Sequence, residues 1–382
     1  MSLSQYRNLF PITADTAYLN HAAISPLSTK VTDAIREHLQ ARSSGPIDVF
    51  QEVMDEKSRL KNNIAELIGA RPEEIALVSN TSEGLNWLVN GLNWQEGDRI
   101  LLPEDEFPSN VYPFLNMRRK GIQVDFVPAR NGETVVSEIE QHMTKETRIL
   151  SVSFVKFYNG IRQDLQLISE LCRANNVLFS VDGIQGVGAF PLDVKKAHID
   201  FLSNGGHKWL MSPMGCGFMY IAPHLHEQLQ PAFAGWLSVK DSWNFFDYNL
   251  DFLDDCSRYE IGTANATAIV GAAAATGLLC QAGTDNIMAH LLDLGDYLIE
   301  KCNHIGLDFT GSPQRNRRSG IYTFKSVEAE SLFNYLKENR VIISLREGAL
   351  RIAPHFYNTK TDIDFLTDQC KQYMQIAGRG HE

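Results

Sequence analysis

The segments VDGIQ (residues 181–185) and SNGGHKW (203–209) decide the fold class of this 382-residue chain. Each follows a short apolar run of strand length, and each brings a side chain that can do chemistry, an aspartate in the first and a lysine in the second. Ligands of open α/β sheets bind outside the carboxyl ends of the strands. We therefore expect Asp182 and Lys208 at the ligand-binding edge of such a sheet.

On both sides of these segments, apolar runs alternate with helical patterns through the first two thirds of the chain. Strands are expected at 75–79, 99–103, 123–127, 149–154, 177–182, 200–203 and 218–222. Amphipathic stretches at 83–91, 111–120, 136–143 and 164–175 lie between them. This alternation predicts an α/β fold with a mostly parallel, seven-stranded sheet covered by helices on both faces.

The pattern changes at about residue 266, where long helices come first and strands follow at 320–326 and around 341–353. This order predicts a smaller α+β domain at the C-terminus. We therefore expect an N-terminal arm (1–20), a large α/β domain (21–265) and a small C-terminal domain (266–382).

Composition argues against several classes of protein. A net charge of −11 argues against a surface built to bind nucleic acid. The six cysteines show no CxxC spacing, so neither a zinc site nor a disulfide framework is predicted. The first residues, MSLSQYRNLF, lack the features of a secretory signal, and the longest low-charge stretch (266–280) is too short to span a bilayer. We expect a cytoplasmic protein without metal, nucleic-acid or membrane partners.

Two segments contain residues suited to binding an anionic, heteroaromatic ligand. Thr81 and Ser82 follow a strand and open a helix, where free N–H groups and hydroxyls can hold an anion. The alternative is that SNTSEG (79–84) is only a helix cap, with Asn80 and Glu83 forming a capping box. Asp182 could hold a proton on a ring nitrogen and Gln185 could contact a neighbouring oxygen, although an Asp-Gly pair is also a common turn.

Lys208 and Arg351 suit the binding of an amino or keto acid. A lysine with a lowered pKa can condense with a carbonyl to form a Schiff base, although most loop lysines are simply solvated. Strand alternation in ALRIAPH (349–355) puts Arg351 on the face opposite Leu350 and Ile352, where its guanidinium could bind a carboxylate. The alternative for Arg351 is a structural ion pair.

Together and in this order, these motifs resemble the class V aminotransferase family of fold-type-I enzymes, which use pyridoxal 5′-phosphate (PLP). The family includes cysteine desulfurases, selenocysteine lyases, isopenicillin N epimerases and kynureninases. The resemblance runs from YLNHAAISPL (18–27) to RIAPHFYNTKTDID (351–364), and VDGIQ followed by HKW is its specific signature. It implies a large PLP-binding domain, a small C-terminal domain and a homodimer.

The resemblance also implies roles for individual residues. Lys208 would form the Schiff base with PLP and act as general acid and base, while Asp182 would pair with the ring nitrogen and Gln185 with the ring hydroxyl. Arg351 would bind the substrate carboxylate, and His21 is a second candidate for substrate binding, with a structural histidine as the alternative. The other cofactor contacts implied are Thr81, Ser82 and His207 at the phosphate, Phe107 stacked on the ring, and Thr263 reaching the phosphate of the neighbouring subunit.

The reaction is the least determined feature. Cysteine desulfurases carry a cysteine in a loop before the carboxylate-binding arginine, and NRVIISLREGAL (339–350) contains none, which disfavours persulfide transfer. We expect an enzyme that acts at Cα of an amino acid, with amino transfer favoured. Epimerisation or C–X elimination is the alternative, with His21, Tyr112 and Tyr158 as candidate proton donors for the former. A non-catalytic sensor or assembly protein is a further alternative, whereas an NAD-type oxidoreductase lacks its glycine fingerprint.

Overall fold

The computed structural model describes residues 3–130 and 132–379 of the chain. A seven-stranded sheet forms its centre, and every strand except β8 runs parallel to the others. The strands, in their order across the sheet, are β2 (Ile75–Val78), β8 (Gly217–Ile221), β7 (Phe201–Gly205), β6 (Leu178–Asp182), β5 (Thr147–Ser153), β3 (Arg99–Pro103) and β4 (Gln123–Val127). The prediction of a mostly parallel, seven-stranded sheet is confirmed.

Different helices cover the two faces of this sheet, as the alternation of side chains along a strand requires. In β3, Leu101 packs into one core, and Ile100 and Leu102 pack into the other. The first core is closed by α2 (Phe50–Ile68), α5 (Val136–His142), α6 (Leu165–Ala174) and α8 (Ala266–Ala282). The second is closed by α3 (Thr81–Gly91), α4 (Tyr112–Leu115) and α7 (Pro223–His226).

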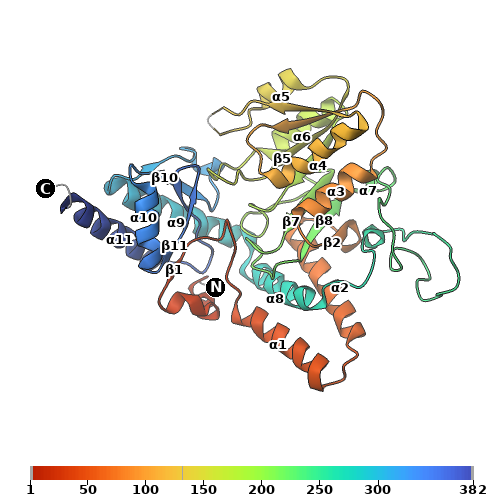
Figure 1. The fold of residues 1–382 in the computed structure, drawn as a ribbon, viewed down its shortest axis with the longest axis horizontal. Coiled ribbons are helices and arrows are strands. Elements are labelled where there is room, and N and C mark those ends of the chain that lie inside the picture. Colours follow the sequence, from red (N-terminus) through yellow and green to blue (C-terminus); the bar gives the residue numbers. More distant parts are fainter. Residues whose placement is uncertain (1–2, 131, 380–382) are drawn as a thin grey trace.

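A small α+β domain lies beside the large one, at the blue end of the molecule in Figure 1. Its antiparallel sheet has the order β12 (Ser344–Arg346), β13 (Ala349–Ile352), β10 (Tyr322–Lys325) and β9 (Asp308–Phe309). Its helices are α9 (Thr284–His304), α10 (Ala329–Glu338) and α11 (Lys360–Arg379). The predicted α+β character of the C-terminal part is therefore present.

No single point in the sequence separates the two domains, because segments from both halves of the chain pack in each of them. The arm enters the small domain, because β1 (Ala17–Tyr18) pairs in parallel with β11 (Val341–Ile342). Helix α8 packs on α2 and on α1 (Thr29–Ser44), so its contacts join it to the large domain. Helix α9 spans both cores, with Ile287 in the first and Leu298 in the core of the small domain. The predicted boundary at residue 266 stays a prediction.

Of the described helices, none alone is long and apolar enough to cross a membrane, and only α8 and α9 together would be, with a bend of 76° between them.

Candidate active site

The two segments that decide the fold meet at one edge of the large sheet. Asp182 is the last residue of β6, and Lys208 lies three residues beyond the end of β7. The two strands are parallel neighbours, with Asp182 in register with Ser203. Because carboxyl ends of parallel strands share one edge, the fold brings the aspartate and the lysine together there.

Asp182 offers one free carboxylate oxygen inside the protein. Its side chain is 1 % exposed, and Oδ1 accepts a hydrogen bond of 3.0 Å from the Ile184 amide. Oδ2 is buried and has no partner among the described residues. Burial raises the pKa of Asp182, and the nearby Glu106 carboxylate raises it further, although the Ile184 hydrogen bond and Lys208 oppose this shift. The site therefore lacks a donor for Oδ2.

Lys208 is buried beside an aromatic ring and near two arginine charges. Its side chain is nearly buried, and Nζ lies 5.4 Å from the centroid of the Phe107 ring. Burial lowers the pKa of Lys208, and the charges of Arg351 and Arg346 lower it further, while Asp182 opposes them. A lysine with a lowered pKa is the form that can act as nucleophile and base.

The predicted phosphate end also contains an unpaired buried donor. Thr81 is the first residue of α3, and its Oγ1 has no partner among the described residues. The proposed helix cap is present as well, because Asn80 Oδ1 accepts a 3.0 Å hydrogen bond from the Glu83 amide. Half-buried Ser82 follows Thr81 in the first turn of the helix. Capping and an open anion site therefore coexist at this helix end.

Gly205 and His207 complete this end of the site. A side chain at Gly205 would place its Cβ 3.3 Å from Thr81 Oγ1 and 3.4 Å from His207 Cε1. Burial, followed by the charge of Lys208, lowers the pKa of the half-buried His207, which favours the neutral ring. The three residues thus surround one small space.

Gln185 is held from two sides. Its Oε1 accepts a 2.9 Å hydrogen bond from Trp209 Nε1, and its Nε2 donates to the carbonyl of Ala22 at 3.0 Å. A side-chain amide carries two N–H donors, so one hydrogen of Nε2 is left for a ligand.

His21 has a protein partner at each ring nitrogen. The ring is fully buried, with Nδ1 2.8 Å from the Ala353 carbonyl and Nε2 2.7 Å from the Tyr357 hydroxyl. Both ring nitrogens are therefore used to tie the N-terminal segment to the small domain. The contacts support the structural alternative for His21 and give its predicted substrate contact no support.

Arg351 enters the site from the small domain. It is 2 % exposed, donates from Nε to Ser344 Oγ at 3.0 Å and from Nη1 to the Phe157 carbonyl at 2.6 Å. Among the described residues no carboxylate pairs with it, so the structure does not show the ion-pair alternative. Burial lowers the pKa of Arg351 to about 9, and the Arg346 charge adds to this effect. Nη2 has no protein partner in the described chain and could bind a carboxylate.

Sequence reasoning missed two features next to these residues. The first is Arg346, whose charge acts on both Lys208 and Arg351. Ser344 and Arg346 are two residues apart on one strand, which could have indicated that they share a face. That Arg351 lies on the same face depends on the pairing of β12 with β13.

The second missed feature is a buried ion-pair cluster behind the site. The Lys156 ammonium, fully buried, contacts Asp105 Oδ1 at 2.5 Å and Glu106 Oε1 at 2.8 Å. Glu106 also accepts hydrogen bonds from the Ser153 amide at 3.0 Å and from Asn110 Nδ2 at 3.0 Å. Burial opposes the charge of Lys156, but the two carboxylates outweigh it and raise its pKa. The sequence feature that could have indicated this cluster is the pair of acidic residues, Asp105 and Glu106, that follows a strand directly before Phe107.

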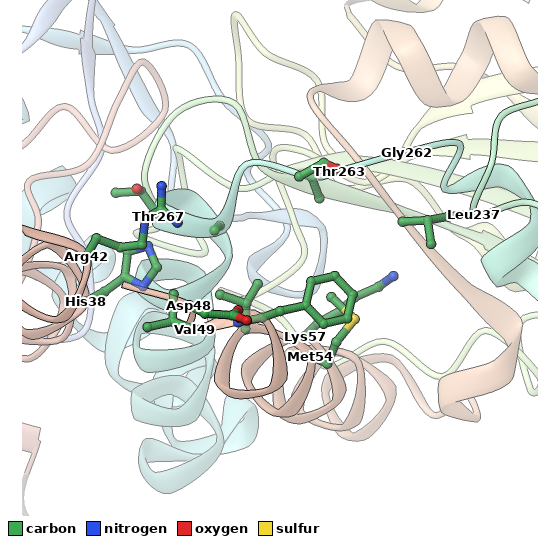
Figure 2. A pocket seen from close by; sticks show the side chains of 14 residues that line it. His38, Arg42, Asp48, Val49, Met54, Lys57, Leu237, Gly262, Thr263 and Thr267 are labelled. Atoms are coloured by element: carbon green, nitrogen blue, oxygen red, sulfur yellow. The ribbon is translucent and has the colours of Figure 1, made fainter. Parts of the chain in front are cut away.

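Thr263 lies apart from these residues, in an exposed segment between η6 (Cys256–Tyr259) and α8. Figure 2 shows it on the wall of a cavity of about 390 Å³, which α1, α2 and Leu237 also line. Its predicted contact with the phosphate of another subunit therefore needs a second copy of the chain and stays a prediction.

The unpaired groups suit PLP. Asp182 Oδ2 and Thr81 Oγ1 are buried and lack partners, which is costly unless a ligand satisfies them. A protonated ring nitrogen would satisfy the first, and a phosphate oxygen the second. No described cluster of three or more His, Cys, Asp or Glu side chains could hold a metal ion.

Comparison with known proteins supports the same assignment. The family model for class V aminotransferases matches residues 17–366. The chain is 27% identical over 365 residues to the uncharacterized aminotransferase YcbU of Bacillus subtilis, covering 96% of each chain. It is 26% identical to a probable cysteine desulfurase of Methanothermobacter thermautotrophicus, covering 100% of this chain and 99% of the relative.

Solved structures share the fold. The apo cysteine desulfurase of Thermococcus onnurineus superposes with a TM-score of 0.88 at 23% identity, covering 97% of this chain and 98% of that one. The complex of the cystine C–S lyase C-DES with cysteine persulfide superposes with a TM-score of 0.87 at 24% identity, covering 94% and 98%. The predicted PLP fold type I is confirmed. The chain therefore belongs to the class V aminotransferase family, and its cofactor is pyridoxal 5′-phosphate.

Proposed function

We propose that this protein is a PLP-dependent lyase that cleaves the bond between Cβ and sulfur in an amino acid, without taking the sulfur onto a cysteine of its own. One observation carries the enzymatic assignment: Lys208, Asp182 and Arg351 come from three separate segments and meet near enough for their charges to interact. The relatives named for desulfuration and C–S cleavage favour sulfur as the leaving group.

Each proposed role follows from a position in the site. Arg351 would hold the substrate carboxylate through its free Nη2, which fixes the orientation of Cα. Lys208 Nζ would take the proton from Cα, because its lowered pKa leaves it able to accept one near neutral pH. Asp182 Oδ2 would hold the proton on the cofactor's ring nitrogen. When bound, PLP supplies the electron sink for the charge released at Cα.

The proposed reaction balances with water as the only co-substrate. The Cα proton moves to Lys208 Nζ, a double bond forms between Cα and Cβ, and the Cβ–S electron pair leaves with the sulfur. The sulfur takes up a proton and leaves as sulfide from cysteine, as a thiol from an S-alkylcysteine, or as cysteine persulfide from cystine. After hydrolysis, a substrate of the cysteine type gives pyruvate and ammonia.

The hairpin before Arg351 argues against a persulfide carrier in this chain. Strands β12 and β13 are joined by Glu347 and Gly348 alone, both with positive φ (47° and 73°), as in a tight two-residue turn. This turn leaves no loop that could carry a cysteine to the site. Cys302 and Cys370 lie in the core of the small domain.

Cys216 is the cysteine whose backbone contacts the Lys208 loop, because its carbonyl accepts a hydrogen bond from the Gly206 amide at 2.9 Å. Burial raises its pKa to about 12, which keeps the thiol protonated and unreactive. We therefore expect that alkylation of accessible thiols leaves the activity of the holoenzyme unchanged.

Amino transfer is the second candidate, and the name of the Bacillus relative favours it. Epimerisation has less support from the contacts. It needs a proton donor opposite Lys208, but Tyr158 donates to Asp105 Oδ2 at 2.8 Å, Tyr112 is largely exposed, and His21 is fully paired.

We further propose a homodimer in which Thr263 reaches the partner's cofactor. The segment between α7 and η6 exposes apolar side chains that a second copy could cover: Trp243 (61 %), Phe245 (59 %), Phe246 (88 %) and Tyr248 (90 %). The cavity in Figure 2 adjoins Thr263 on the same part of the surface.

The proposed reaction can be tested with the purified holoenzyme and a panel of L-cysteine, L-cystine and S-alkyl-L-cysteines. Without a keto-acid acceptor, we expect pyruvate, ammonia and the sulfur product in equal amounts, and none with Lys208→Ala. The sulfur product is sulfide from cysteine, a thiol from an S-alkylcysteine and cysteine persulfide from cystine. A keto acid that retains the substrate's side chain, and forms only when 2-oxoglutarate is added, would support amino transfer instead.

A further inference from the structure

The substrate side of the site carries more positive charge than one carboxylate requires. The charges of Arg351 and Arg346 both act on Lys208, and that of Arg346 also acts on Arg351. Among the described residues, Asp182 is the acidic group that opposes them at Lys208. Asp182 would pair with the ring nitrogen of PLP and so would not be available to pair with an arginine. Two guanidinium groups are then left to face the substrate, in a chain whose overall charge is −11.

The register of the β12–β13 hairpin places both guanidinium groups on one face. Ser344 lies directly opposite Arg351, and the hydrogen bond between their side chains shows that they share a face. Side chains two apart on a strand point the same way, so Arg346 shares the face of Ser344. Leu345 and Leu350 point to the other face, where they pack in the core that includes α10.

Arg346 and Arg351 are diagonal neighbours on this face, because Arg346 is in register with Ala349. Diagonal neighbours in an antiparallel pair are about 7–8 Å apart. Two guanidinium groups on one face can bind two acids at the ends of one small molecule, one acid each.

Arg346 itself is free to bind. The residue is exposed, and Nη1 donates a 2.9 Å hydrogen bond to the carbonyl of its neighbour Leu345. In the described part of the chain no carboxylate pairs with it. By contrast, Arg340 on the same domain pairs with Asp15 at 3.1 Å, and Arg318 pairs with Asp296 at 2.8 Å.

We propose that Arg346 binds a second acidic group at the far end of the substrate, so that the enzyme selects amino acids with a distal carboxylate or a similar anion. This inference rests on the proposed function, in which Arg351 holds the α-carboxylate of the same molecule. Arg346 thereby determines specificity without taking part in the bond changes.

Equilibrium binding to the holoenzyme tests this inference without turnover. Titration calorimetry compares glutarate, which has two carboxylates, with butyrate, which has one. We expect glutarate to bind at least about tenfold more tightly than butyrate to the wild type, and Arg346→Gln to remove most of that ratio of affinities. The loss of a charge that acts on Arg351 should affect both ligands alike and leave the ratio as the readout. Arg346→Lys should retain part of it. The charge-matched control is Lys337→Gln on the solvent side of α10, which should keep the full preference.

A matched pair of substrates gives a second readout. S-(2-carboxyethyl)-L-cysteine and its side-chain amide differ in one charge at the distal end. We expect Arg346→Gln to raise KM for the acid about tenfold relative to KM for the amide. Any change in kcat that follows from removing a charge that acts on Lys208 should be the same for both substrates.

The outcomes separate this inference from the proposed function. If Arg351→Gln weakens butyrate binding but Arg346→Gln leaves the glutarate preference intact, the distal site is wrong and the carboxylate site of Arg351 stands. If Arg351→Gln leaves butyrate binding unchanged, the proposed function fails at its substrate contact. Equal binding of glutarate and butyrate to the wild type would also overturn the inference.

Discussion

The two walls of the site are built in opposite ways. The cofactor wall comes from the large domain and contains Asp182, Gln185 and Lys208, with Glu106 and Lys156 behind them. Most of its polar groups are buried and already hydrogen-bonded or paired. The substrate wall is the β12–β13 hairpin of the small domain, where Arg351 is buried. Arg346 is exposed there and has no acidic partner among residues 3–130 and 132–379.

This difference separates the task of holding a cofactor from that of choosing a substrate. Buried pairs cost free energy when one partner is removed, so the cofactor wall should tolerate little change. An exposed cation on a hairpin can be changed at small cost in stability, so the substrate wall can alter specificity. Substitutions in the two walls should therefore differ both in size of effect and in the property that changes.

The largest effect is expected for Lys208→Ala in the cofactor wall. Loss of a positioned general acid and base should lower the rate of Cα proton exchange by about 10²- to 10⁴-fold. Proton NMR in heavy water with L-cysteine measures this rate. Borohydride reduction should also fail to attach PLP covalently to the variant. The control is Lys337→Ala, which should behave as the wild type, and exchange by Lys208→Ala above a tenth of the wild-type rate would contradict the role.

A large loss of stability is expected for Lys156→Met, also in the cofactor wall. The substitution leaves the buried Glu106 carboxylate and the partly buried Asp105 carboxylate without their cation. Removing one partner of a buried pair costs about 3–5 kcal/mol. Denaturation by urea of the apoprotein measures this loss.

The matched control for Lys156→Met is Lys337→Met, whose exposed side chain should change the free energy of unfolding by less than about 0.5 kcal/mol. Equal stability of the two variants would show that the cluster does not support the wall.

A moderate effect is expected for Arg351→Lys in the substrate wall. Lysine keeps the charge but cannot form the planar pair of hydrogen bonds to a carboxylate. Such bonds are worth about 1.5–3 kcal/mol, so kcat/KM should fall about 10- to 150-fold. Steady-state kinetics on the substrate identified by the amino-acid panel measures the ratio. Arg340→Lys serves as the control, and an unchanged kcat/KM for Arg351→Lys would remove this residue from substrate binding.

The cofactor wall was the more predictable one, because its chemistry lies in short contiguous motifs. Strand period and the position of Asp182 and Lys208 at strand ends were enough to place both at one sheet edge. The seven strands were also anticipated, since buried parallel strands are continuous apolar runs. Thr81 was found with its capping alternative, and the structure contains both features.

The substrate wall was only half predicted, because its geometry depends on pairings that a single strand does not reveal. The alternation around Arg351 was visible, but the face shared with Arg346 depends on the register across a two-residue turn. His21 depends on tertiary contacts in the same way. Its motif suggested substrate contact, and only the tertiary partners Ala353 and Tyr357 show both ring nitrogens in use. The Lys156 pair likewise joins residues about fifty positions apart.

The smallest effect, and the finest test of the cofactor wall, is the pH dependence of Asp182→Asn in the apoprotein. The pKa of Asp182 is raised in the folded state, chiefly by burial, above its ordinary value of about 3.9. The folded-state pKa is about 7. Between pH 4 and pH 7 the folded state therefore holds more protons than the unfolded state, so ionisation of Asp182 lowers the stability of the wild type as pH rises through this range. Asparagine cannot ionise, so the variant should melt a few degrees above the wild type at pH 8, with the difference shrinking toward pH 4.

Adding PLP should reverse the order of the two melting temperatures, so that the wild type melts above Asp182→Asn. Asp182 Oδ2 then gains the donor that it lacks in the apoprotein, whereas asparagine cannot hold a positively charged ring nitrogen as well. The wild type should therefore gain more in melting temperature from PLP than Asp182→Asn does, as thermal unfolding with and without the cofactor would show. The exposed Asp368→Asn is the control and should follow the wild type in both states. Equal gains for the wild type and Asp182→Asn would mean that Oδ2 is not the group that meets the cofactor.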